Sequence, residues 1–227
     1  MTTQAFTCSI TGTGNQGGRL FSGTATDAAF TSVNTITGSA ELGFAMKGKT
    51  ISNVTANYAA GSCAWVIKNR VTQTYDRVGF GSLMAATGVY GYKIQPLMIV
   101  QDHVLQSYTL AAGTTYMMWL KMRGRPPELF TGTIANAATG EMTTVTDGSS
   151  LGSFADQSVE WIKVQGPDGK VVNSLQIFDA NGGEIYGQFG GEREVLGGAS
   201  GGNTNMCIEG LAIPIARGMT VKLTVQA

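Results

Sequence analysis

The chain has 227 residues with a formal net charge of zero, and only 13% of its residues are charged. No long-range electrostatic field therefore attracts it to nucleic acid or to an anionic membrane, and zero net charge favours association between copies. The single histidine, His103, and the absence of a cofactor-binding motif disfavour an enzyme, so we expect no cofactor and no metal.

In chain order, the first residues show no basic region followed by an apolar run, so we expect no secretory signal and synthesis in the cytoplasm. The three cysteines, Cys8, Cys63 and Cys207, are far apart in the sequence. We expect free thiols packed in a core, with a Cys8–Cys63 disulfide as the alternative.

Short alternating or apolar runs, each closed by a glycine or asparagine, predict strands along most of the chain. Before the midpoint these runs are Phe6–Ile10, Ala40–Met46, Ile51–Tyr58, Cys63–Lys68, Lys93–Val100, Val104–Leu110 and Thr115–Met122. After it they are Met142–Thr146, Val159–Gln165, Ser174–Phe178, Glu184–Phe189, Met206–Ile208 and Met219–Val225. The best helical candidates are short alanine-containing stretches near Ala85 and Ala135. We predict an all-β fold, an antiparallel β-sandwich of the jelly-roll kind.

Three segments predict tight turns. Asp179–Gly183 contains Asn-Gly, the strongest short-range hairpin signal, and Gly166–Gly169 places Pro and Gly where a turn requires them. Ala216–Gly218 precedes the last strand, and Pro214 favours a sheet edge.

The domain organisation has two readings. The preferred one is a single β-sandwich region over residues 1–227, with a Gly/Thr-rich N-terminal arm of about residues 1–18 that lies on another chain. The alternative is two β lobes, 1–122 and 129–227, joined at the proline-containing segment 123–128. Gly12–Gly18 and Gly197–Asn203 are expected to be loops or arms, and no clear internal repeat is visible.

Motifs that could support chemistry are weak. Gly12–Gly17 has the glycine spacing of a dinucleotide-binding loop, but no helix is predicted after it, so a glycine loop is the better interpretation. Asp102, His103 and Ser107 supply the residue types of a hydrolase triad. Asp102 and His103 point to opposite faces of one strand, however, and we expect His103 to be a turn or interface residue.

Acidic residues give no defined site either. Asp179 and Asn181 resemble the opening of a calcium loop, but Gly183 stands where a third oxygen ligand is needed. A pair of carboxylates could serve glycoside hydrolysis, which makes a glycosidase the third functional class. The carboxylates considered for that role are Glu160, Asp179, Glu184, Glu192 and Glu194. We predict no catalytic residue and no metal ligand.

The aromatic residues divide into two groups. Trp65, Trp119 and Trp161 lie in apolar strand runs and are expected in the core. Tyr90 and Tyr92 lie beside glycines and could present a flat surface, so they are candidate contacts for a glycan or a protein interface.

Two segments resemble known families. Leu110–Tyr116, followed by the apolar run Met117–Lys121, is similar to a strand entry in carbohydrate-binding jelly rolls. The closing segment Leu211–Val225 is similar to the last hairpin of some bacteriophage virion proteins. With the Gly/Thr/Ala-rich, nearly uncharged composition, the chain as a whole resembles a capsid or capsid-decoration protein.

This resemblance implies a non-enzymatic structural role in a virion, either in the shell or as a decoration subunit that stabilises neighbouring subunits. The expected partners are other copies of the chain, in a trimer or a lattice, and other virion proteins, with no direct contact to nucleic acid or membrane. The alternative is a carbohydrate-binding β-sandwich module or a phage appendage protein that binds surface glycans through Tyr90 or Tyr92.

Overall fold

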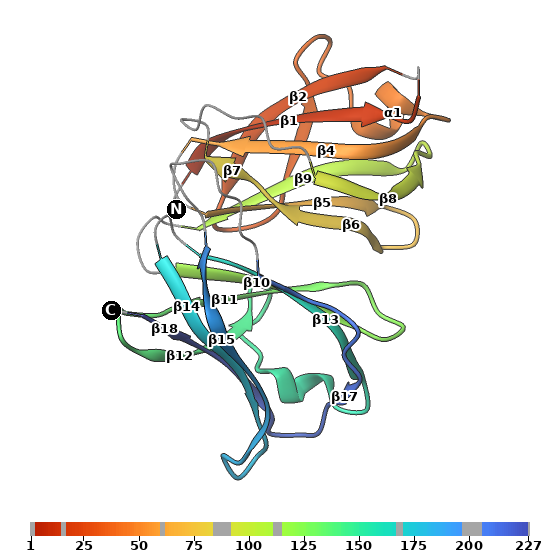
Figure 1. Ribbon diagram of the computed structural model, residues 1–227. Helices are drawn as coiled ribbons and strands as arrows, with labels where there is room; N and C mark the ends of the chain where they lie inside the picture. Colours follow the sequence, from red (N-terminus) through yellow and green to blue (C-terminus); the bar gives the residue numbers. More distant parts are fainter. Residues whose placement is uncertain are drawn as a thin grey trace. The chain divides into compact units, whose positions relative to one another are not determined.

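The computed structural model describes residues 3–14, 17–59, 62–83, 92–110, 115–166, 170–196 and 206–226. It divides the chain into two compact units, 1–112 and 113–227, each with its own sheet and core (Figure 1). Strands account for 60% of the residues and helices for 5%, which confirms the all-β prediction. The division lies between Ala112 and Gly113, whereas segment 123–128 connects two strands of the second unit.

The first unit contains a nine-stranded sheet and one short helix. Its elements are β1 (Thr3–Gly12), β2 (Gly18–Thr26), β3 (Thr31–Thr35), α1 (Leu42–Met46), β4 (Thr50–Tyr58), β5 (Ser62–Asn69), β6 (Tyr75–Phe80), β7 (Ser82–Leu83), β8 (Tyr92–Met98) and β9 (His103–Leu110). The strand order is β6-β5-β9-β3-β2-β1-β4-β7, with β8 also beside β4. Because β6 pairs with β5 and the adjoining β7 pairs with β4, the sheet closes on itself like a barrel.

Strand β1 lies inside this sheet, paired with β2 on one side and β4 on the other. Its side chains alternate, and Phe6, Cys8 and Ile10 are fully buried in the first core. The prediction of an N-terminal arm is therefore wrong for Thr3–Gly12. The residues between the buried ones are mostly polar, so the sequence of β1 does not look like that of a core strand. Only one face of such a strand needs to be apolar.

Helix α1 replaces part of the strand predicted over Ala40–Met46. Leu42 and Met46 are one helical turn apart and both fully buried, whereas Phe44, between them, points outward and is 80% exposed. The helix has five residues, which is too short for a helical period to be recognised in the sequence.

The second unit contains a second nine-stranded sheet, which forms a half-barrel. Its elements are β10 (Thr115–Met122), β11 (Glu128–Thr133), β12 (Thr139–Thr144), the 3-10 helix η1 (Leu151–Phe154), β13 (Ser158–Gln165), β14 (Lys170–Phe178), β15 (Glu184–Leu196), β16 (Met206–Ile208), β17 (Ile213–Pro214) and β18 (Thr220–Val225). The strand order is β15-β14-β18-β12-β11-β10-β13-β16, with β17 also beside β13.

The hairpin turn predicted from the sequence forms, whereas the helix predicted near Ala135 does not. The Asp179–Gly183 turn connects β14 to β15 as expected, and Asp179 Oδ1 accepts the N–H groups of Asn181 and Gly183, each over 2.8 Å. Ala135 lies in the connection between β11 and β12 and not in a helix. Residues 85, 167–169 and 197–203 lie outside the described residues.

The two units have the same strand order, although the sequence shows no clear repeat. Seven strands correspond one to one in chain order and in neighbours: β1 to β10, β2 to β11, β3 to β12, β4 to β13, β5 to β14, β6 to β15 and β9 to β18. Helix α1 stands between β3 and β4, and η1 stands between β12 and β13. The chain is thus two copies of one structural module.

Loop hydrogen bonds repeat together with the topology. The N–H of Thr35 donates to the carbonyl oxygen of Ala40, and the N–H of Ala40 donates to Thr35 Oγ1, both over 2.8 Å. Thr144 and Ser149 make the same two bonds over 2.9 Å each. Each threonine fastens the loop that leads from its strand into the short helix.

Register and hydrogen bonds align the two units residue by residue. Aligned pairs with the same residue type are Gly14 and Gly124, Leu20 and Leu129, Phe21 and Phe130, Gly23 and Gly132, Thr35 and Thr144, Leu42 and Leu151, Gly43 and Gly152, and Ile99 and Ile215. The matches are separated by unlike residues and their spacing changes along the chain, which is why the sequence alone conceals the repeat.

Candidate interaction site

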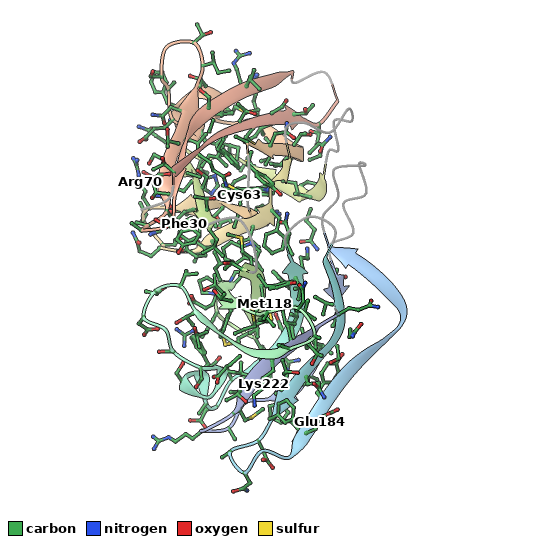
Figure 2. The ribbon with its side chains drawn as sticks, turned by 90° about the vertical axis from the view of Figure 1, so that its left-hand side faces the viewer. Phe30, Cys63, Arg70, Met118, Glu184 and Lys222 are labelled. Atoms are coloured by element: carbon green, nitrogen blue, oxygen red, sulfur yellow. The ribbon has the colours of Figure 1, made fainter. Side chains whose placement is uncertain are left out.

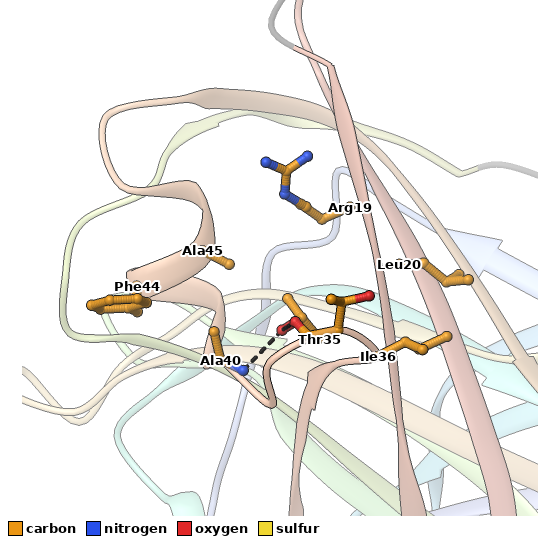
Figure 3. Close-up of a pocket in the computed structure, with 8 residues that line it drawn as sticks. Arg19, Leu20, Thr35, Ile36, Ala40, Phe44 and Ala45 are labelled. Atoms are coloured by element: carbon orange, nitrogen blue, oxygen red, sulfur yellow. Dashed lines mark hydrogen bonds between the residues drawn. The ribbon is translucent and has the colours of Figure 1, made fainter.

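A hollow of about 620 Å³ lies in the first unit, beside α1. We call it the α1 hollow, and it is lined by Arg19, Leu20, Thr35, Ile36, Thr37, Ala40, Phe44 and Ala45. Figure 3 shows Phe44 and Ala45 on α1 at one side, and Leu20 and Ile36 at the other.

Three large apolar side chains at this hollow are open to solvent. Leu20 is 50% exposed, Ile36 is 54% exposed and Phe44 is 80% exposed. They come from β2, from the loop after β3 and from α1. Single exposed apolar residues are common on protein surfaces, but a group of them around one hollow is typical of an interaction site.

The wall of the hollow is held by the buried side chain of Thr35. Its Oγ1 accepts the N–H of Ala40 (Figure 3). The same hydroxyl donates to the carbonyl oxygen of Thr37 over 2.9 Å. The N–H of Ile36 donates to the carbonyl oxygen of Leu20 over 3.1 Å, which joins the loop to β2. The apolar groups are therefore presented on a fixed backbone.

Arg19 is the one charged residue that lines the hollow, and its position is exposed. Its guanidinium donates to the carbonyl oxygen of the adjacent Gly18 over 3.2 Å. No ion pair among the described residues includes Arg19. The hollow thus combines apolar surface with one positive charge that no described carboxylate neutralises.

The equivalent positions of the second unit have different chemistry. Glu128 stands where the first unit has Arg19, and Leu129, the counterpart of Leu20, is only 2% exposed. The backbone hydrogen bonds on either side of the two short helices align, but η1 has one residue fewer than α1. No apolar residue of the second unit therefore aligns with Phe44. Among the described residues, this face of the second unit therefore has no exposed aromatic side chain that corresponds to Phe44.

The glycan candidates lie largely outside what the structure describes. Tyr90 is outside the described residues. Tyr92 is the first residue of β8, and its backbone pairs with Val54 of β4. The structure therefore leaves the role of Tyr90 and Tyr92 as a prediction.

His103 is buried at the start of β9 and is 2% exposed. Its Nδ1 accepts the N–H of Val100 over 3.1 Å, so its Nε2 carries the proton that it shares with Asp76 Oδ2, 2.8 Å away. The partner carboxylate is Asp76 and not Asp102, and no hydrogen bond of the described residues joins His103 to Ser107. The N–H of His103 also donates to the carbonyl oxygen of Val100 over 3.2 Å, so His103 closes a turn, the first of its two expected roles. In the second unit the aligned Met219 accepts the N–H of Ala216 through its sulfur at the same place in the turn.

Arg77, next to Asp76 on β6, connects β6 to β8. Its guanidinium donates to the carbonyl oxygens of Gln95 and Pro96, each over 2.9 Å. Burial lowers the pKa of Arg77, and the neighbouring Asp76 opposes that effect. Arg77 thus uses its charge to close the barrel between strands that are not paired through their backbones.

The acidic candidates for hydrolysis have separate structural partners. Glu160 forms ion pairs with Lys121 and Arg123, over 3.3 and 3.6 Å. Asp179 caps its turn, and Glu184 accepts a bond from Gln176 over 2.7 Å. The side chains of Glu192 and Glu194 lie outside the described part of the chain.

The cysteines are free thiols, so the Cys8–Cys63 disulfide does not form. Cys8 and Cys63 are buried as predicted, and Figure 2 shows Cys63 inside the first unit. Burial raises the pKa of both thiols. Cys207 is exposed, contrary to the prediction. Trp65 and Trp119 are buried as expected, whereas Trp161 is only partly buried.

Within the described ranges, no group of three or more His, Cys, Asp or Glu side chains is arranged to hold a metal ion. Neither α1 nor η1, the helices in the described part of the chain, is long and apolar enough to cross a membrane. Comparison of the chain with protein-family models, with curated proteins and with solved structures gives no match.

Proposed function

We propose that this chain is a non-enzymatic structural subunit of a viral particle, either in the shell or as a decoration subunit, and that it contacts other virion proteins through the α1 hollow. The observation that carries the proposal is the exposed group of Leu20, Ile36 and Phe44. Exposed apolar side chains around a hollow gain free energy when a partner removes them from water, at roughly 25 cal/mol per Å².

The two repeated β units suit a structural role. Each unit has its own core, and the loops around the α1 hollow are fastened by buried hydrogen bonds. A rigid surface loses little conformational entropy on association, so more of the burial energy remains for binding.

Copies of the chain are proposed to associate through β15, in a trimer or a lattice. β15 has 13 residues and ends its sheet, because β14 is its only partner among the described strands. Such an edge offers unpaired backbone groups to a neighbouring strand. Sedimentation velocity should show association that increases with concentration, and a concentration-independent monomer would contradict this part of the proposal.

The test of the particle role uses gradient centrifugation. The full-length chain, the variant Phe44→Ser and the control Val71→Ser are each produced together with the particles. Val71 is 74% exposed, but it lies between β5 and β6, outside the α1 hollow and outside β15. We expect the wild type and V71S to sediment with the particles and F44S to remain at the top of the gradient. Wild-type chain confined to the top would contradict the proposal.

The variants Phe44→Ser and Tyr92→Ala distinguish glycan binding, the rival function, from the particle role. Specific binding on a glycan array that is lost in Y92A would favour a carbohydrate-binding module. If no glycan is bound while particle binding depends on Phe44, the structural role is favoured.

A further inference from the structure

We infer that the α1 hollow receives an extended, proline-containing segment of a partner polypeptide that carries a carboxylate opposite Arg19. This inference rests on the proposed interface role and names the chemistry of the partner. It comes from comparing the hollow with the aligned face of the second unit, where the chain supplies such a segment itself.

In the second unit, the connection between β10 and β11 is Arg123-Gly124-Arg125-Pro126-Pro127. Pro127 is buried, and the Arg125 guanidinium lies over the ring of Phe154, 5.2 Å from its centre. Phe154 ends η1, so Arg125 lies against the aligned short helix. The proline segment and its charged side chain thus pack within the same unit.

The Arg125 guanidinium acts electrostatically on Glu128, which lies on the face of the second unit that aligns with the α1 hollow. Burial raises the pKa of Glu128, Arg125 lowers it, and Asp147 raises it again. Glu128 is the counterpart of Arg19. In the second unit, therefore, a carboxylate on the face is matched by an arginine from the segment beside it.

The first unit has the opposite arrangement. Its β1–β2 connection, residues 13–17, contains glycine at 14 and 17 and no proline, and residues 15 and 16 lie outside the described ones. Arg19 replaces the carboxylate of Glu128, and Gly38 aligns with Asp147, so the charge of the face is reversed. A segment that fits here needs a carboxylate where the second unit uses Arg125, together with apolar surface for Leu20 and Phe44.

Proline suits this occupant for an energetic reason. An extended proline segment has few conformations to lose and places its rings against aromatic and aliphatic side chains. The exposed Phe44, which has no apolar counterpart in the second unit, supplies the aromatic surface.

The test uses two synthetic peptides with the full-length chain. The acidic probe is acetyl-Gly-Glu-Pro-Pro-Leu-amide, and the basic probe has arginine in place of glutamate. Binding is followed by fluorescence anisotropy and located by amide chemical shifts in NMR spectra. We expect the acidic probe to bind about threefold tighter or more, as one exposed ion pair allows, and to shift the amides of Leu20, Ile36 and Phe44. The preference should weaken in high salt.

Three variants make the test specific. Arg19→Glu should reverse the preference between the probes, Phe44→Ser should weaken both, and the control Val71→Ser should change neither. Thermal unfolding of each variant shows whether it is folded, and a surface change at Arg19 should leave the melting temperature nearly unaltered.

Equal binding of both probes, no reversal in R19E, or shifts confined to the second unit would each overturn the inference. So would a self-association lost in F44S without any peptide binding, because the occupant would then be a second copy. If the chain sediments with particles but binds neither probe, only this inference fails. If the probes bind as expected but the chain is absent from particles, only the proposed function fails.

Discussion

At the scale of single residues, Thr35 and Thr144 do the same work in the two units. Both are buried, and each accepts the N–H of the residue five positions later through Oγ1. A buried N–H without a partner costs more free energy than a formed hydrogen bond contributes. These threonines therefore determine whether the loop into each short helix is fixed.

Replacing Thr35 by valine, which has nearly the same shape, should lower the free energy of unfolding by about 1–3 kcal/mol, because the Ala40 N–H loses its acceptor. Thr144→Val should have a smaller effect in the same urea denaturation, because Asp147 Oδ1 also accepts the Ser149 N–H. The exposed Thr133→Val is the control and should change the free energy of unfolding by less than about 0.5 kcal/mol. A neutral effect of both buried substitutions would contradict the role given to these bonds.

Asp147 gives a prediction for pH dependence. Its Oδ1 accepts the Thr144 hydroxyl over 2.5 Å and the Ser149 N–H over 3.0 Å, and these hydrogen bonds lower the pKa of Asp147. A carboxylate whose pKa is lower in the folded than in the unfolded state stabilises the fold at pH values above its ordinary pKa. This stabilisation is lost as the pH falls through the pKa of the folded state.

The variant Asp147→Asn should therefore have a lower urea midpoint than the wild type at pH 7. The two midpoints should converge as the pH falls toward about 2. Glu141→Gln, an exposed carboxylate of the same unit, is the control. If the difference between the two urea midpoints stays constant from pH 7 to about pH 2, the charge of Asp147 is not its cause.

At the scale of elements, β1 and β10 are equivalent inner strands. Ile10 and Leu120 occupy the same register position, one residue before a shift in pairing, and both are fully buried. Ile10→Ala and Leu120→Ala should each lower the free energy of unfolding by about 2–5 kcal/mol through lost burial and a cavity. The measurement is urea denaturation with Thr11→Ala, on the exposed side of β1, as control. A small effect of I10A alone would support the arm originally expected at the N-terminus.

The elements that could be predicted are those with a clear apolar pattern. β9, β10, β13 and β18 each have buried side chains at regular positions, and their runs were recognised in the sequence. β2, β3 and β6 were not, because they are rich in Gly, Thr and charged residues and bury few side chains. Such strands are specified by their neighbours in the sheet and not by their own composition.

At the scale of the whole molecule, the chain is a tandem repeat whose copies have diverged in their surface chemistry. The core positions stay apolar in both units, as Phe21 and Phe130 show. The candidate site lies where the copies differ, at Arg19 and Phe44. This site could not be predicted from the sequence. A phenylalanine within an apolar run is expected in the core, and only the backbone of α1 shows that Phe44 points to solvent.

Because each unit buries its own core, residues 113–227 expressed alone should fold. We expect a β-type circular dichroism spectrum and a single cooperative thermal transition. The matched fragment is 1–112, which should behave in the same way. A fragment that has no cooperative transition would show that the repeat needs its neighbour.

One measurement tests most directly whether the α1 hollow is the contact with a particle protein. The photo-crosslinking residue p-benzoylphenylalanine replaces Phe44, or Val71 as control, and purified particles that contain the chain are irradiated before mass spectrometry. Val71 is 74% exposed and lies outside the hollow. We expect a cross-link from position 44 to a second particle protein and none to that protein from position 71. If position 44 forms no cross-link to any particle protein in particles that contain the chain, the hollow is not the contact.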